Sequence, residues 1–286
     1  MSRLISTFRS RRGWMLLCVH FSFSFAALAG ILQLILAVRP TTDLQGGRMI
    51  VWLVALSCLW AVMRSVPRES VGRDFKQPGF SVVVKVGDLF AEQSGLIIGF
   101  TDVFDTSTED GDIISPRSVQ GQFLEKVFHG DTAALDEALR GALSGSPVLE
   151  SESEASKPRG KRDRYPLGTV AVIAGGEFKY YGVAYSRMSN DLVAQSSVDY
   201  LWRSLDNAWS TLSSNGHLEP VAIPVLGSDL AKVGSLGRES LIKMIVLSFV
   251  ARSRVSLVSR KLTVVVQRSD FDEVDFNEVQ AFISSL

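Results

Sequence analysis

Cysteine and histidine are scarce in this chain of 286 residues. Its two cysteines, Cys18 and Cys58, both lie in apolar runs near the N-terminus, and residues 80–286 contain none. A disulfide framework is therefore excluded for that larger part of the chain, which fits a reducing compartment. The three histidines do not have the spacing of a metal site, and the sequence contains neither a Walker loop nor a G-x-S-x-G elbow. No metal ligand and no catalytic residue is predicted from these patterns.

The chain also has no net charge, but its charges are unevenly distributed. Before Phe80 there are 10 Lys and Arg against 3 Asp and Glu, and from Phe80 onward there are 20 against 27. A protein that binds the phosphate backbone of nucleic acid normally carries a basic face. Because the larger part of the chain is acidic, nucleic acid is not an expected partner.

Two long apolar runs lie near the N-terminus. Trp14–Val38 contains 25 residues without a formal charge, enough to cross the roughly 30 Å hydrocarbon layer as a helix. The run exceeds the about 7–15 apolar residues of a signal peptide and no cleavage pattern follows it, so a transmembrane helix is predicted. Met49–Met63 has only 15 residues, which as a helix measures about 22 Å and is short of a full span. Snorkelling arginines and local thinning can close this gap, and an interfacial or re-entrant helix is the alternative.

Basic residues flank this pair of runs on their outer sides. Four of them precede the first run: Arg3, Arg9, Arg11 and Arg12. Four follow the second run: Arg64, Arg68, Arg73 and Lys76. Only Arg39 and Arg48 lie between the runs. By the positive-inside rule, both ends of the hairpin face the cytoplasm. The predicted order is a basic cytoplasmic N-terminus 1–13, membrane helices 14–38 and 49–63 joined by a short external loop 39–48, a juxtamembrane linker 64–79 and a cytosolic domain 80–286.

Strand and helix patterns alternate in residues 80–286. Strands are predicted at Phe80–Val86, Leu96–Phe100, Gly168–Ile173, Lys179–Tyr185, Val221–Val225 and Leu262–Gln267. Helices are predicted at Ser118–Phe128, Thr132–Leu143, Val198–Leu212, Arg238–Ala251 and Phe276–Ile283. The residues 174–177 have the length and the glycines of a hairpin turn. Strands flanked by helices, with one hairpin, indicate an α/β sandwich on a mixed sheet.

The segment 144–164 has no periodic apolar pattern. It is rich in Ser, Glu, Pro, Lys and Arg, with an acidic part followed by a basic part. Such a composition is typical of a solvated loop, and we expect this loop to be mobile. A flap that reaches a bound diphosphate, or a contact with anionic lipid, is the alternative interpretation of its basic part.

Two strand ends carry glycines in positions that suit a ligand. Val221–Gly237 joins a buried strand to a glycine-containing loop and then to a helix, a layout that offers an anion several backbone N–H groups and a favourable dipole. A glycine needed only for the turn is the ordinary alternative. Asp88 follows the first strand and Gly87, where it can cap a turn or accept a hydrogen bond from an adenine amino group.

The order of these elements resembles that of macro domains, which bind ADP-ribose. The resemblance rests on a strand ending in Gly-Asp-Leu (87–89), the strand Leu-Ile-Ile-Gly-Phe (96–100) and Pro-Val-Leu-Gly-Ser (224–228) before a helix. With the membrane hairpin, Ser-Val-Gln-Gly-Gln-Phe (118–123) and Arg-Tyr-Pro-Leu-Gly-Thr (164–169), nearly the whole chain resembles the macro-domain effectors of Thoeris antiphage systems. The expected fold is therefore a macro-domain-like α/β/α sandwich preceded by a two-helix transmembrane hairpin.

The resemblance implies a set of ligand-binding residues. Asp88 and Leu89 stand where macro domains contact adenine, with Phe271 as a possible neighbour. The segment 99–105, with Gly99, Phe100, Thr101 and Asp102, stands where the distal ribose is approached. The diphosphate loop is implied at Pro224, Val225, Leu226, Gly227, Ser228 and Leu230.

Two positions depart from the macro-domain pattern. Hydrolytic macro domains usually place asparagines after the second strand, whereas this chain has Phe-Thr-Asp-Val-Phe-Asp (100–105). Asp229 occupies a position that is often glycine, and a carboxylate beside a diphosphate is repulsive unless it points away or meets a cationic part of the ligand. The first departure favours binding over hydrolysis of ADP-ribose.

The resemblance implies a ligand-gated effector rather than an enzyme. Its signal would be an ADP-ribose derivative, plausibly histidine-linked ADP-ribose, made from NAD by a partner TIR-domain enzyme. Binding would disrupt the bacterial inner membrane and arrest or kill the infected cell, which is abortive infection. Since two helices cannot enclose a pore, we expect homo-oligomers in contact with membrane lipids. The alternatives are a membrane-tethered ADP-ribosyl hydrolase and a passive membrane scaffold.

Overall fold

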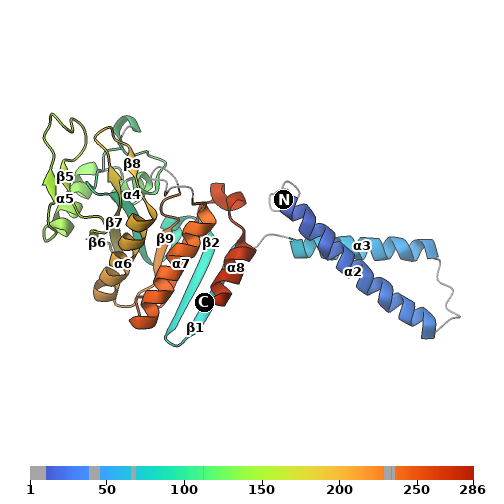
Figure 1. The fold of residues 1–286 in the computed structure, drawn as a ribbon. Coiled ribbons are helices and arrows are strands. Elements are labelled where there is room, and N and C mark those ends of the chain that lie inside the picture. Colours follow the sequence, from blue (N-terminus) through green and yellow to red (C-terminus); the bar gives the residue numbers. More distant parts are fainter. Residues whose placement is uncertain (1–10, 39–45, 66–68, 112, 229–232, 234–235) are drawn as a thin grey trace. The chain divides into compact units, whose positions relative to one another are not determined.

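The structure is a computed structural model that describes residues 11–38, 46–65, 69–111, 113–228, 233 and 236–286. The chain divides into two compact units, residues 1–68 and 69–286 (Figure 1). The first unit contains the two apolar helices, and the second contains a sheet with helices on both faces. Each unit is described here by itself.

Two long helices form the first unit, α2 (Arg11–Val38) and α3 (Gly46–Ser65). Both are long and apolar enough to cross a membrane by length and composition. The helix α3 has 20 residues, about 30 Å at 1.5 Å per residue, and so is longer than its central apolar run predicts. Its terminal glycines and arginines continue the helix beyond the apolar run on both sides.

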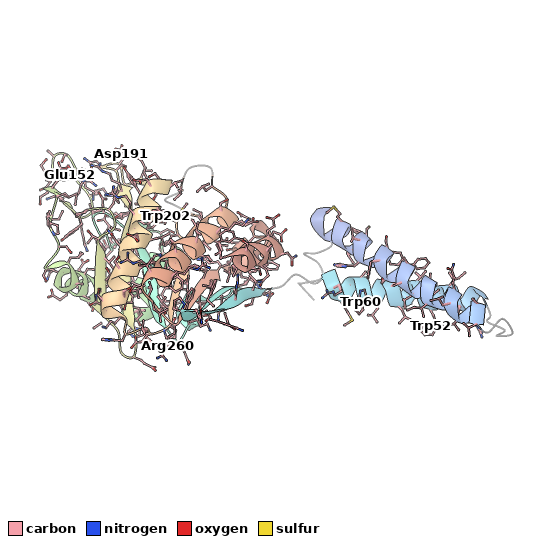
Figure 2. All side chains as sticks on the ribbon, turned by 60° about the horizontal axis from the view of Figure 1, so that its bottom comes forward. Trp52, Trp60, Glu152, Asp191, Trp202 and Arg260 are labelled. Atoms are coloured by element: carbon pink, nitrogen blue, oxygen red, sulfur yellow. The ribbon has the colours of Figure 1, made fainter. Side chains whose placement is uncertain are left out.

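Serines pack where the two helices touch. Ser24 and Ser57 are 7% and 0% exposed, and the Ser24 hydroxyl lies 3.0 Å from the Phe21 carbonyl and 3.4 Å from the Ser57 carbonyl. In contrast, Trp52 and Trp60 are 67% and 52% exposed and lie along the outer side of α3 (Figure 2). The buried residues of this unit are thus mainly small, Ser24, Ser57 and Ala61 together with Leu17, while many large apolar side chains face outward.

The second unit is organised around a mixed sheet of eight described strands. In chain order these are β1 (Ser70–Lys76), β2 (Gly79–Val86), β3 (Gly95–Thr101), β6 (Val170–Ala174), β7 (Lys179–Met188), β8 (Ala194–Gln195), β9 (Val221–Pro224) and β10 (Lys261–Val266). Their spatial order is β1-β2-β10-β9-β3-β7-β6, with β8 paired to β7. The five strands from β2 to β7 in this order run parallel, and β1, β6 and β8 are antiparallel to their neighbours.

Each face of the sheet buries its own apolar cluster, since successive side chains of a strand point to opposite faces. Ile97 packs with the helices α6 (Val198–Asn215), α7 (Arg238–Val255) and α8 (Phe276–Ser285). Ile98 packs with α4 (Val119–Phe128) and α5 (Thr132–Leu143) on the other face. The predicted α/β sandwich on a mixed sheet is confirmed. Each predicted strand and helix overlaps an element of the same type, although the predictions at 168–173, 221–225, 262–267 and 118–128 extend one or two residues beyond the observed element.

The structure corrects the predicted linker 64–79. Residues 70–76 form the edge strand β1, which pairs with β2 over its whole length. Phe75 stacks on Phe80 with ring centroids 4.5 Å apart, and the Gln280 side chain of α8 bonds both peptide groups of Gly72. The mixture of charged and apolar residues in this segment conceals the strand, because an edge strand exposes much of its surface to water.

The structure also corrects the predicted mobile loop 144–164. The short strands β4 (Glu150–Ser151) and β5 (Asp163–Arg164) pair in an antiparallel ladder. Two of its cationic side chains, Lys157 and Arg164, are 0% and 5% exposed, so the basic part is not solvated throughout. Composition suggests solvation because Asp105 and Asp102, the buried acidic partners of these side chains, lie elsewhere in the chain.

A buried polar contact joins α6 to α7. Trp209 is 0% exposed, and its indole N–H donates to the Ser248 hydroxyl at 2.9 Å. We expect Ser248→Ala to lower the free energy of unfolding of the full chain by about 1–3 kcal/mol, because it leaves a buried N–H without an acceptor. Chemical denaturation in detergent, followed by circular dichroism, measures this change.

The matched control is Ser210→Ala on the same layer. The Ser210 hydroxyl is exposed and donates to a carbonyl of its own helix at 2.9 Å, so its loss should change stability by less than about 0.5 kcal/mol. Equal effects of the two substitutions would contradict the role assigned to the contact between Trp209 and Ser248.

Candidate functional site

The candidate site lies where parallel strands end and separate. The strands β2, β10, β9, β3 and β7 end at Val86, Val266, Pro224, Thr101 and Met188, at one edge of the sheet. In the described ladder, β3 and β9 pair only through Gly95↔Val221 and Leu96↔Ala222. Beyond these pairs the two strands diverge toward their carboxyl ends, which is where open α/β sheets bind ligands.

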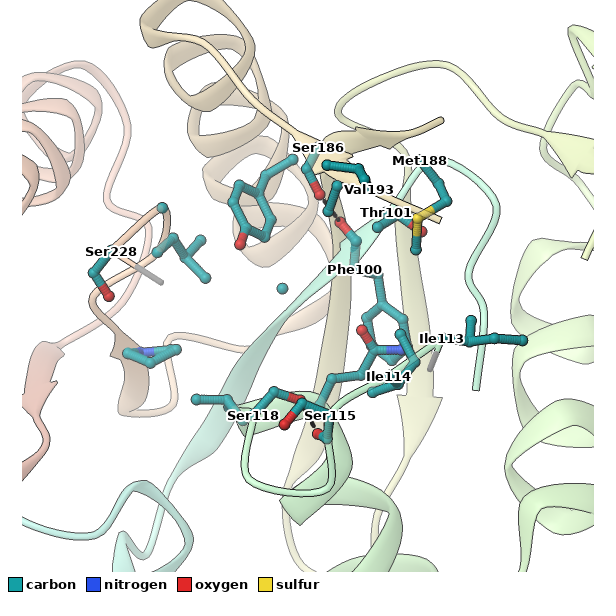
Figure 3. Close-up of a pocket in the computed structure, with 18 of the residues that line it drawn as sticks. Phe100, Thr101, Ile113, Ile114, Ser115, Ser118, Ser186, Met188, Val193 and Ser228 are labelled. Carbon is teal, nitrogen blue, oxygen red and sulfur yellow. Dashed lines mark hydrogen bonds between the residues drawn. The ribbon is translucent and has the colours of Figure 1, made fainter. Parts of the chain in front are cut away.

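A cavity of about 350 Å³ occupies this divergence. Its described lining comes from the ends of β3, β7 and β9, the segment before α4 and the segment around β8: Gly99, Phe100, Thr101, Gly111, Ile113, Ile114, Ser115, Ser118, Val119, Gln120, Tyr185, Ser186, Met188, Leu192, Val193, Ala194, Pro224, Val225, Leu226, Gly227 and Ser228. In Figure 3, Ser228 lies at one side and Ile113 and Met188 at the other. The volume is in the range of small-molecule sites, about 300–1,000 Å³.

The structure thus brings together two predicted segments, 99–101 and 224–228. Gly227 has φ +80°, the left-handed region that glycine adopts without strain. The Ser228 hydroxyl donates to the Val225 carbonyl at 2.9 Å and closes the turn. A Cβ on Gly99 would lie 2.5 Å from a ring carbon of Tyr185, so only glycine leaves this wall undisturbed.

The N-terminus of α4 forms the wall opposite this turn. The Ser118 hydroxyl accepts from the Gly121 N–H at 3.0 Å and donates to the Ser115 carbonyl at 2.7 Å. A Cβ on Gly121 would meet the Ser115 carbonyl oxygen at 2.4 Å, so this glycine allows the segment 115–118 to lie against the helix. The first turn of a helix presents free N–H groups and a positive dipole end, which favours an anionic ligand group.

One buried hydroxyl in the lining has no partner. Thr101 is 5% exposed, and within the described part of the chain its Oγ1 makes no hydrogen bond. A buried polar atom usually has a partner, so a missing one requires an explanation such as a ligand or water. Thr101 lies among Ser186, Met188 and Val193 in the cavity (Figure 3).

Asp102 is predicted to contact the ligand, but the structure turns it away from the cavity. The side chain is 3% exposed and is not among the described lining residues. Its Oδ2 accepts from the Arg164 guanidinium at 2.7 Å, and its Oδ1 accepts from the Met188 N–H at 2.8 Å. A carboxylate is buried here because a cation and a backbone N–H satisfy both oxygens.

The remaining predicted site residues are also away from the described cavity. Asp88 follows β2 at the same sheet edge, but it lines a separate hollow and pairs with Lys126 of α4 at 2.7 Å. Leu89 is buried in the apolar cluster beneath α4 and α5. Phe271 packs against Phe276 with ring centroids 5.7 Å apart. Leu230, like Asp229, lies outside the described residues.

Several lining residues are not predicted from the sequence. Tyr185, Met188 and Val193 come from the end of β7 and from its connection to β8. Tyr185 ends the predicted strand, and the extension of β7 to Met188 carries Met188 to the sheet edge. Nothing in the residue types of the three indicates a pocket. Within the described ranges, no three His, Cys, Asp or Glu side chains gather as a metal site would require.

Comparison with solved structures defines the class of protein. The macrodomain of Oceanobacillus iheyensis, solved with ADP, is similar to this chain with 13% identity and a TM-score of 0.50, covering 76% of this chain and 98% of that one. The same macrodomain solved with MES bound has a TM-score of 0.48 at 13% identity, covering 76% of this chain and 98% of that one. At this identity the first match shows the fold alone, which is that of a macro domain.

A family model assigns the chain to a narrower group than the fold alone does. A family model described as "Thoeris protein ThsA, Macro domain" matches residues 82–267, and the chain belongs to that family. No curated protein matches the chain. Membership implies antiphage defence, binding of an ADP-ribose derivative and a functional partnership with a TIR-domain protein.

The pair of Asp88 and Lys126 predicts a small pH dependence. The hydrogen bond from Lys126 lowers the pKa of the Asp88 carboxyl from its usual 3.8. Because this pKa is lowered on folding, the carboxylate stabilises the fold above about pH 4, and the contribution is lost as pH falls through the folded pKa. We expect Asp88→Asn to lower stability at pH 7 by less than about 1 kcal/mol, since the pair is exposed.

Thermal denaturation of both proteins across pH measures this difference. The asparagine still caps the short helix that follows, because its side-chain oxygen can accept from the Phe90 N–H as Asp88 does at 3.0 Å. A difference that stays constant down to about pH 2 would contradict the ion-pair origin.

Proposed function

We propose that this chain is a ligand-gated membrane effector of a Thoeris system. Its pocket binds an ADP-ribose derivative made by the TIR-domain partner, for which histidine-linked ADP-ribose is our candidate. Binding then changes the assembly of the membrane hairpins, the bacterial inner membrane is breached and the infected cell stops growing. The observation that carries this proposal is a macro-domain cavity at the carboxyl edge of the sheet, in a chain of the ThsA macro-domain family that also has two helices able to cross a membrane.

The chemistry of the cavity suits a nucleotide diphosphate. The turn 224–228 and the N-terminus of α4 supply backbone N–H groups from two sides, as anion sites do. Hydroxyls of Thr101, Ser115 and Ser118 suit ribose oxygens, and the apolar lining suits an uncharged ring. The similar macrodomain of Oceanobacillus iheyensis was solved with ADP, which supports a ligand of this class.

We further propose that the pocket binds its ligand rather than cleaving it. The described lining consists of apolar side chains, hydroxyls and one carboxamide, Gln120. Such groups hold a ligand by contact and hydrogen bonds. The buried carboxylate next to the β3 wall, Asp102, has both oxygens occupied by Arg164 and Met188, which makes it a poor general base for an attacking water.

Gating sets an energetic requirement. A ligand can shift an equilibrium between two assemblies only through its differential affinity for them. A difference in binding free energy of about 5.5 kcal/mol moves the equilibrium from 1:99 to 99:1. A hairpin of two helices cannot enclose a pore by itself. We therefore propose that the active form is a homo-oligomer whose hairpins contact one another and membrane lipids.

Calorimetry on the full chain in detergent tests the ligand class. We expect ADP-ribose to bind and Gly99→Val to weaken binding at least about tenfold, because its side chain would displace Tyr185 and Leu226 at the cavity wall. The control is Gly141→Val on α5, where a Cβ would meet nothing within 4 Å. In cells, Gly99→Val should lose phage protection and Gly141→Val should retain it.

Three outcomes would contradict this proposal. Absence of heat with both ADP-ribose and its histidine conjugate would reject the ligand class. Release of ADP-ribose from a modified protein by the wild-type chain, detected by mass spectrometry, would instead indicate an ADP-ribosyl hydrolase. Phage protection that persists in Gly99→Val despite lost binding would indicate a passive scaffold.

The proposed topology places both chain ends in the cytoplasm. A bias of arginine and lysine toward the two outer flanks of the hairpin supports it. We expect a C-terminal green fluorescent protein fusion to fluoresce and a C-terminal alkaline phosphatase fusion to be inactive. The reverse pattern would contradict a cytoplasmic C-terminal domain, and recovery of the fusions in the soluble fraction would contradict membrane insertion.

A further inference from the structure

Two buried carboxylates lie in the segment that directly follows β3. Asp102 and Asp105 are 3% and 1% exposed, and neither belongs to the described lining of the cavity. The residues just before them, 99–101, form one of its walls. A buried carboxylate is strongly unfavourable unless it is paired and hydrogen-bonded. Both cationic partners come from residues 150–164, which we call the clasp.

Arg164 of the clasp connects two walls of the cavity. Its Nη1 donates to Asp102 Oδ2 at 2.7 Å and to the Met188 carbonyl at 2.9 Å. Asp102 Oδ1 in turn accepts from the Met188 N–H at 2.8 Å. The ion pair therefore holds both peptide groups of a lining residue on β7 against the end of β3.

Lys157 of the clasp pairs with Asp105, which is also bonded to a third wall of the cavity, the start of α4. Its ammonium is 0% exposed and lies 3.5 Å from Asp105 Oδ2, while the Lys161 N–H donates to Asp105 Oδ1 at 2.5 Å. The side chain of Gln120, a lining residue on α4, donates to the Asp105 carbonyl. Gln120 thus ties the start of α4 to the backbone of Asp105, and the clasp holds the carboxylate of the same residue.

A glycine allows the clasp to approach this closely. Gly160 has φ +76°, and a Cβ there would lie 2.7 Å from Asp105 Oδ1. The Arg164 side chain is further fixed by Glu152 at 2.8 Å and Asn190 at 2.9 Å. Four partners around one guanidinium define its position far better than a single ion pair would.

We propose that Arg164 and Lys157 are positioning residues for the ligand pocket, acting through Asp102 and Asp105 without touching the ligand. They fix the relative placement of the walls from β3, β7 and α4. They also neutralise two carboxylates beside a pocket that receives an anionic ligand, which would otherwise be repelled. The nature of this ligand rests on the proposed function, whereas the coupling of the walls does not.

The test uses Arg164→Lys in the full chain, with Arg162→Lys as the matched control. Lysine keeps the charge but loses the planar fork that reaches Asp102, Met188 and Asn190 together. Arg162 lies in the same clasp and is partly exposed; it pairs with Glu154 at 3.5 Å and donates to the Lys157 carbonyl at 3.2 Å, and neither of these partners is a buried carboxylate or a described lining residue. Hydrogen exchange followed by mass spectrometry measures the protection of the backbone amides in the cavity walls, and calorimetry measures the affinity for ADP-ribose.

We expect Arg164→Lys to speed exchange of the Met188 amide at least about tenfold, with the amides of α7 and β10 unchanged, and to weaken ADP-ribose binding at least about tenfold. Arg162→Lys should change neither. A merely structural role would instead lower protection throughout the sheet. Unchanged exchange at Met188 in a folded Arg164→Lys variant would overturn the proposal, as would unchanged affinity for a bound ADP-ribose.

Two further results are distinguishable. If the wild-type chain does not bind ADP-ribose, the proposed function fails while the exchange measurement still decides the coupling of the walls. If Arg164→Lys does not fold, the uncharged pair Asp102→Asn with Arg164→Gln replaces it. This double variant lacks the guanidinium that holds the Met188 carbonyl, although its asparagine can still accept from the Met188 amide. Exchange at Met188 should therefore again speed at least about tenfold with α7 and β10 unchanged, and unchanged exchange at Met188 in the folded double variant would overturn the proposal.

Discussion

Parallel pairing of β2, β10, β9, β3 and β7 is the constraint on which the rest of the second unit depends. It places five carboxyl ends at one edge and buries both faces, so helices must cover each side. The ladder between β3 and β9 contains two described pairs before the strands diverge. The cavity is a consequence of this divergence, and its walls are the backbone segments that the strands deliver to that edge.

The neutral lining and the charged surroundings of the cavity have a common origin. The segment after β3 is rich in acidic residues, and its two buried carboxylates, Asp102 and Asp105, pair with the clasp and do not belong to the described lining of the cavity. The backbone of this segment can then lie against the cavity while its charges are compensated on the other side. Pairing of these carboxylates also requires the clasp to fold over the segment after β3. This requirement explains why the clasp, although strongly polar, has buried contacts.

Much of the fold was accessible from the sequence, because apolar periodicity is a local property. The alternation in β2 and the helical spacing in α6 reveal their elements directly. The turn after β9 also indicated the cavity, because its left-handed conformation requires a glycine, Gly227, which is visible in the sequence. Partners distant in sequence were not accessible. Asp102 directly follows a strand and so resembles a ligand contact, but Arg164, its partner, lies 62 residues away.

The side chain of Gln280 has a consequence for how copies of this chain can associate. It occupies the N–H and C=O groups of Gly72 on β1, which an edge strand would otherwise present to another strand. Addition of a neighbouring molecule to the sheet at this position is thereby blocked by an amide from the chain's own last helix. Contacts between copies at this position of β1 must then use side chains and not a strand ladder, and the apolar outer faces of the hairpin helices are exposed surfaces of that kind elsewhere in the chain.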